Sequence, residues 1–132
     1  MNDEVLKYVV QKVEETNIGQ GITLFLHGII IEGNMINSRT YYDLLSDLNN
    51  NVEIITKDQD KIDKWNSYKD DFIEFIESMK NKEVSLDYIY LRDAIIKNPN
   101  ERIPRVCPAW KGKISSVDGF SFGHQNFEIT DQ

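Results

Sequence analysis

Residues 22–33 read ITLFLHGIIIEG, and this stretch decides which folds the chain can adopt. Two runs rich in β-forming residues, 22–26 and 29–32, flank the pair His27 and Gly28. A two-residue hairpin turn needs positive φ at both central positions. Glycine takes positive φ freely, and histidine adopts it more often than most residues. The stretch therefore predicts an antiparallel hairpin.

Gly33 lies inside the second strand of this hairpin, where a glycine marks a bulge or a sharp bend. A second region with a period of two residues begins at Leu86 and continues to Ile96, which predicts another strand. Prolines at three positions then predict a loop: Pro99, Pro104 and Pro108. Residues 110–117 are expected to form the last long strand, ended by Asp118 and Gly119.

Three segments have the periodicity of amphipathic helices. Residues 3–16 place apolar side chains on one stripe, and Gly19 and Gly21 are expected to end this helix. A short helix begins near residue 38, with Ser38 as its cap. A longer helix runs from about Asp58 to Lys80.

Together these elements predict an α+β fold. We expect a small, strongly bent antiparallel sheet or barrel of about five strands, with an N-terminal helix and an inserted helical segment at 38–83. The length of 132 residues is that of one ordinary domain, so we expect a single domain over 1–132, with a tail at 124–132.

The charge pattern bears on the kind of partner. The chain has a net charge of −7, yet residues 97–113 hold five basic residues against Glu101 alone. An acidic chain repels phosphate backbones, so nucleic-acid binding is disfavoured. The lone Cys107 excludes an intrachain disulfide, and the uncharged stretch 17–31 is too short and too rich in glycine to span a bilayer. These features predict a cytoplasmic protein.

The sequence offers little for catalysis. Residues 119–123 match the G-x-S-x-G pattern of hydrolases, but only nine residues follow, too few for the helix and further triad members that Ser121 would need. His27 and His124 have no carboxylates at metal-ligand spacing. Asp58, Asp60 and Asp63 lack the glycine and glutamate of a calcium loop. We expect no enzyme, no metal and no cofactor.

Trp110 is the most informative single residue for binding, because it lies beside Lys111 and Lys113. A tryptophan next to basic residues can anchor a partner, or it can be a core residue with a hydrogen-bonded indole. The hypothesis for a partner-binding surface includes the tryptophan and the nearby cations: Arg102, Arg105, Trp110, Lys111 and Lys113.

Two strings of the second half, YIYLRDAII at 88–96 and WKGKISSVDGFSFG at 110–123, resemble the gas vesicle accessory protein U family. The hairpin segment 21–33 is similar to the first hairpin of that family. Gas vesicles are gas-filled protein shells that give some bacteria buoyancy. The resemblance implies a non-enzymatic protein that acts in vesicle assembly or clustering and binds gas vesicle proteins.

The order of elements is also similar to Sm-like small barrels, in which a helix precedes five bent strands and subunits pair edge strands into rings. The segment 38–83 would then replace the usual middle hairpin. This likeness implies a homo-oligomer and, as the alternative function, an RNA-binding module.

Overall fold

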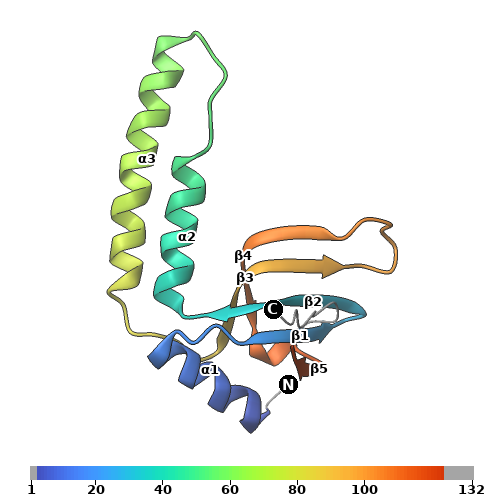
Figure 1. Ribbon diagram of the computed structural model, residues 1–132. Coiled ribbons are helices and arrows are strands. Elements are labelled where there is room, and N and C mark those ends of the chain that lie inside the picture. Colours follow the sequence, from blue (N-terminus) through green and yellow to red (C-terminus); the bar gives the residue numbers. More distant parts are fainter. Residues whose placement is uncertain (1–2, 124–132) are drawn as a thin grey trace, which may run out of the picture.

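The computed structural model describes residues 3–123 (Figure 1), and the predicted tail at 124–132, with His124, lies outside them. Within that range three α-helices and five strands confirm the α+β fold. The helices are α1 (Glu4–Thr16), α2 (Ser38–Asn50) and α3 (Gln59–Lys80). The strands are β1 (Gly21–Leu26), β2 (Ile29–Ile36), β3 (Tyr88–Lys97), β4 (Arg105–Lys113) and β5 (Gly119–Phe122).

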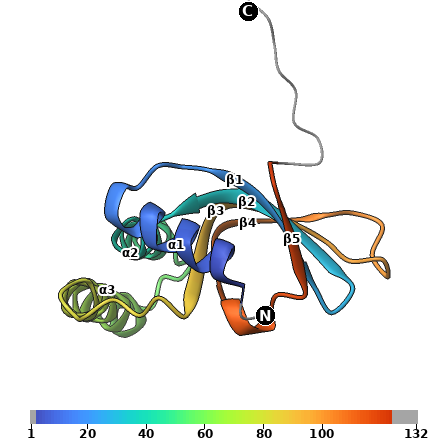
Figure 2. The same ribbon diagram turned by 90° about the horizontal axis from the view of Figure 1, so that it is seen from below.

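The strands form one antiparallel sheet in the order β4-β3-β2-β1-β5. β4 and β5 are the two edges and do not pair with each other, so the sheet is not closed into a barrel. Of the two forms that the sequence left open, the bent sheet is therefore present and the barrel is not. Figure 2 shows the strands curving past one another with α1 against one face.

The hairpin turn is as predicted. His27 has a φ of 49° and Gly28 a φ of 82°, and the two strands pair from Leu26 with Ile29 outward. The backbone N–H of His27 donates to the Asp118 carboxylate at 2.7 Å, which ties the turn to the start of β5.

Gly33 marks a register shift between β2 and β3, as its position inside the strand predicts. A Cβ at this position would lie 3.2 Å from both the Arg92 carbonyl oxygen and the Leu91 Cβ. Glycine is therefore needed here for close approach of the two strands, and its φ is not in the left-handed region.

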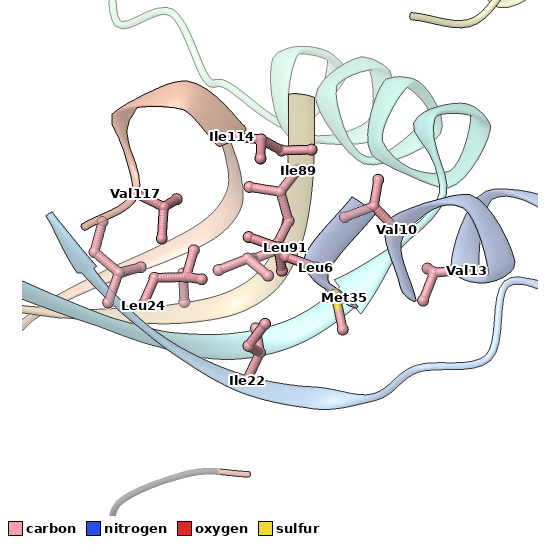
Figure 3. Close-up of a cluster of buried hydrophobic side chains, with 12 residues drawn as sticks. Leu6, Val10, Val13, Ile22, Leu24, Met35, Ile89, Leu91, Ile114 and Val117 are labelled. Carbon is pink, nitrogen blue, oxygen red and sulfur yellow. The ribbon is translucent and has the colours of Figure 1, made fainter. Parts of the chain in front are cut away.

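The helix α1 covers one face of the sheet. The carboxylate of Asp3 caps it by accepting from the Leu6 N–H at 3.0 Å. Leu6, Val10 and Val13 point into the apolar core (Figure 3). The helix ends at Asn17, whose φ is 54°, so the expectation that Gly19 and Gly21 end it is wrong. Asparagine also tolerates the left-handed conformation of a helix end.

The core lies between α1 and the sheet. Its members are apolar and nearly inaccessible to solvent: Leu6, Val10, Val13, Ile22, Leu24, Ile31, Met35, Ile89, Leu91, Ala94, Ile114 and Val117. We call α1 and the five strands, with this core, the sheet body.

The helices α2 and α3 follow β2 and precede β3 in the chain. They form an antiparallel pair that projects from the sheet, and we call this pair the helical arm (Figure 1). Asp58 caps α3, which begins where the sequence predicts a helix. Asn37 caps α2 by accepting from the Thr40 N–H, and Ser38 is the first residue of the helix, so the expected Ser38 cap is off by one residue.

The last strands differ from prediction. β4 begins at Arg105, five residues before the expected start, and a short 3₁₀ turn at Ile114–Ser116 follows it. Pro108 lies inside β4 and not in the loop. A proline fits an edge strand, because one side of that strand has no ladder to which an N–H must donate. Gly119 opens β5 where a strand end was expected.

Candidate functional site

The five residues of the predicted binding surface lie along one edge of the sheet but do not gather at one place. Arg102 lies in the loop that joins β3 to β4, and Arg105 begins β4. This end of the β3–β4 hairpin points away from the helical arm (Figure 1). Lys111 and Lys113 lie at the other end of β4. Arg105 and Lys113 are eight residues apart in β4, which is about 27 Å along the strand at about 3.4 Å per residue.

The arginine end is partly neutralised by its own loop. The guanidinium of Arg105 donates to both carboxylate oxygens of Glu101, at 2.9 and 3.0 Å. Ile103 and Val106 are exposed apolar residues at the same end, with 78% and 73% of their surface accessible. These two were not among the sequence candidates, and only their position beside two prolines and two arginines could have indicated them.

Trp110 is half-buried and packs against the core cluster. Its ring also covers Gly112, because a Cβ at that glycine would lie 2.3 Å from the Trp110 Cη2 atom. Trp110 and Gly112 share one face of β4, since residues two apart on a strand point the same way. The indole thus has a packing role on the α1 side of the sheet.

Lys111 points to the opposite face, where it lies over two tyrosines. Its Nζ is 4.2 Å from the centre of the Tyr88 ring and 5.7 Å from that of Tyr90. The pairing of Tyr90 with Lys111 across β3 and β4 places these side chains together. A cation over a tyrosine face is attracted by the ring quadrupole, so the lysine is held in place without a carboxylate.

A cluster of tyrosines fastens the helical arm to this face. Tyr41 and Tyr42 from α2 lie with ring centres 4.9 and 6.5 Å from Tyr90. Burial, reinforced by the neighbouring Tyr42, raises the pKa of Tyr90, and burial likewise raises the pKa of Tyr41. Both phenols therefore stay neutral to a higher pH than an exposed tyrosine and serve as packing groups.

Two hollows are lined by Tyr88, and the second of them lies at the base of the helical arm. The first has a volume of about 280 Å³ and is lined by Lys7 of α1 and Lys113. The second has a volume of about 200 Å³ and is lined by Lys82 and Lys111. Sequence reasoning missed Lys7, Lys82 and Tyr88, because they come from three separate segments and no spacing links them.

Lys80 also lines the second hollow, but its charge is already satisfied. Its Nζ donates to Asp43 at 2.6 Å and to Glu77 at 3.3 Å. The hydrogen bond to Asp43 is the main reason that the pKa of Lys80 is raised. This lysine joins α2 to α3 and offers little to an outside anion.

A family model described as "Gas vesicle protein GvpU-like" matches residues 3–125. The chain belongs to this gas vesicle protein family. The match covers the hairpin, the helical arm and both strings at 88–96 and 110–123, so the resemblance seen in the sequence is confirmed. No curated protein and no solved structure matches the chain.

The remaining sequence candidates lie apart from this surface in the GvpU-like chain. Ser121 lies in β5 opposite Thr23, in extended backbone and not at the strained turn that a nucleophilic serine needs. His27 is exposed in the hairpin turn, with its Nδ1 4.0 Å from Asp118. Asp58 caps α3, so the acidic residues around it begin a helix.

Residues 3–123 contain no group of three or more His, Cys, Asp or Glu side chains that could hold a metal ion. In the same range no helix combines the length and the apolar composition that crossing a membrane requires.

Proposed function

We propose that this GvpU-like chain is a non-enzymatic accessory protein that acts in gas vesicle assembly or clustering by binding other gas vesicle proteins. The family match over residues 3–125 carries this proposal. With this role we expect the protein in the cytoplasm, on or near the vesicles. The strand, turn and helix-cap positions of Ser121, His27 and Asp58 give no support to an enzymatic role.

The contact surface that we propose is the edge formed by β4 and its preceding loop: Arg102, Arg105, Trp110, Lys111 and Lys113. In this surface the lysines make direct contacts, and Trp110 holds the strand in place from the other face. An acidic protein with one basic edge can select an acidic partner by charge complementarity, which speeds encounter and fixes orientation.

The two open edges of the sheet also support a homo-oligomer. Unpaired strands present free N–H and C=O groups to another chain. Pro108 interrupts the ladder on β4, and β5 has only four residues. Both features limit unrestricted strand addition, so we expect a small, defined assembly.

Flotation tests the proposal. The purified protein is mixed with intact gas vesicles, the vesicles are allowed to rise, and the floating layer is assayed for the protein. We expect co-flotation with the wild type and its loss in a Lys111→Glu, Lys113→Glu variant. A Lys57→Glu, Lys61→Glu variant makes the same charge change on the exposed arm and should still float.

Protein that stays entirely below the vesicles would contradict direct binding to the shell, and soluble gas vesicle proteins would then be tested as partners. RNA binding is the alternative function. The net charge of −7 disfavours RNA binding. Support for this alternative would be a gel shift of RNA at low salt that the two lysine substitutions abolish.

A further inference from the structure

The two hollows beside Tyr88 are neighbours, because Tyr88 lines both of them. They flank the start of β3, with Asp87 lining the first hollow and Ser85 the second. We call the two hollows, with the four lysines that line them, the lysine cradle: Lys7, Lys82, Lys111 and Lys113.

The cradle collects positive charge on a chain that is acidic overall. Its lysines come from α1, from the segment after α3 and from β4. In the part of the chain that the structure describes, no ion pair involves any of the four. Lys80, at the border of the cradle, shows the contrast, since two carboxylates hold it. The cradle lysines are therefore available to an outside anion.

The tyrosines Tyr88 and Tyr90 favour binding of such an anion in the cradle. The Tyr88 ring holds the Lys111 ammonium at 4.2 Å, which lowers the side-chain entropy lost when a ligand binds. The neighbouring phenol of Tyr90 is neutral at physiological pH, so it does not repel a negative group. Asp87 lines the first hollow and Glu83 the second, and the lysines outnumber these two carboxylates, which leaves a net positive charge.

The size and spacing of the hollows indicate side chains as the ligand. Their volumes of about 280 and 200 Å³ lie just below the range of ordinary small-molecule pockets and leave room for acidic side chains. Lys113 lines one hollow and Lys111 the other, two residues apart on one face of β4. This places them about 7 Å apart, which is also the spacing of alternate side chains in an extended peptide.

We propose that the lysine cradle binds an extended acidic segment of a partner protein, with carboxylates at alternate positions entering the two hollows. This inference rests on the proposed function in one respect, since the segment would belong to a gas vesicle protein. It adds the chemistry of the partner: a Glu-x-Glu or Asp-x-Asp pattern in chain that is free to extend.

Fluorescence anisotropy with a labelled peptide tests the inference on the full chain. The probe is GSEAEAEGS, and the matched control GSQAQAQGS has the same length without the carboxylates. We expect saturable binding of the glutamate peptide that weakens as salt rises, and no binding of the glutamine peptide. The Lys111→Gln, Lys113→Gln variant should bind at least tenfold more weakly, whereas Lys57→Gln, Lys61→Gln should bind as the wild type does.

Absence of glutamate-peptide binding by the wild type would overturn the inference, as would an equal loss in both variants, which would indicate a general charge effect. Binding of a single-stranded RNA in preference to the peptide, lost in the Lys111→Gln, Lys113→Gln variant, would assign the cradle to phosphates and also overturn it. Circular dichroism melting of each variant separates loss of binding from loss of folding.

The peptide assay contains no vesicles, so its failure is distinct from failure of the proposed function. If the wild-type protein floats with vesicles but does not bind the peptide, the result would contradict only the proposal for the lysine cradle. Protein that binds the peptide but never floats would leave the cradle in place and overturn direct shell binding.

Discussion

The sheet body and the helical arm use their apolar residues in different ways. The body gathers aliphatic side chains from α1, three strands and the region of the 3₁₀ turn into one cluster, in which Leu6, Ile22, Leu24 and Leu91 are fully buried. The 22-residue helix α3 buries only Ile76, and α2 buries only Ser38. The arm instead exposes several large apolar residues: Leu48, Val52, Ile54, Ile55, Tyr68, Ile73 and Phe75.

This difference teaches where the stability of the molecule resides. Burial of apolar surface is the dominant favourable contribution to folding, at about 25 cal/mol per Å². The arm relies on the contact between its two helices, on the packing of Tyr41 and Tyr42 against Tyr90, on its caps and on ion pairs such as Lys80 with Asp43. Exposed ion pairs contribute at most about 1 kcal/mol each. The body should therefore tolerate changes to the arm far better than the reverse.

The largest effect is expected from Leu91→Ala in the centre of the body. Leu91 has no accessible surface and pairs with Met35 on one side and Trp110 on the other. The cavity should lower the free energy of unfolding by about 3–5 kcal/mol, measured by urea unfolding. Phe75→Ala on the arm, where the ring is 57% exposed, is the matched control and should cost much less. Equal losses at the two positions would show that the arm is as tightly packed as the body.

A smaller effect is expected from Gly33→Ala at the bend of β2. The added methyl would lie 3.2 Å from the Arg92 carbonyl oxygen and the Leu91 Cβ, so the strands must move apart. We expect a loss of about 1–3 kcal/mol in the same measurement. Gly19→Ala is the control, since its nearest neighbour would be the Met35 carbonyl oxygen at 3.8 Å. A neutral Gly33→Ala would mean that the register shift needs no glycine.

The junction between body and arm should respond to alkaline pH through Tyr90. Because burial raises the pKa of Tyr90 above its unfolded value of 10.0, the unfolded state loses its proton first. The contribution of Tyr90 is complete below pH 10 and falls as pH rises above it, by up to about 1.4 kcal/mol per pH unit. Urea unfolding between pH 9 and 11 should show a shallower decline for Tyr90→Phe than for the wild type. Parallel declines would place Tyr90 in solvent.

Much of the fold could be predicted because its signals are local. The positive φ at His27 and Gly28, the start of the long helix near Asp58 and the bend at Gly33 each depend on the residue and its immediate neighbours. The start of β4 could not be predicted in this way. Pro108 ends a strand in most settings and is tolerated here because β4 is an edge, and that is a property of the assembled sheet.

The candidate site was predicted only in part for a related reason. Lys111 and Lys113 were included because they lie beside Trp110 in the sequence. Arg105 was included for the same reason, but it lies at the opposite end of the extended strand β4. Lys7 and Lys82 reach the same hollows as these lysines from distant segments. Within a turn or a helix, residues that are close in the sequence are also close in space. An extended strand instead moves such residues apart, and packing of the sheet brings distant segments together.

The smallest effect is expected at the tip of the helical arm. Ile55 lies between α2 and α3 with 99% of its surface accessible, so its side chain buries nothing that folding could use. Ile55→Ser should change the free energy of unfolding by less than about 0.5 kcal/mol. A loss comparable to that of Gly33→Ala would mean that the tip is covered in solution. A neutral result would show that the isoleucine is not needed for stability, and flotation of the same variant would then test whether the tip contributes to binding.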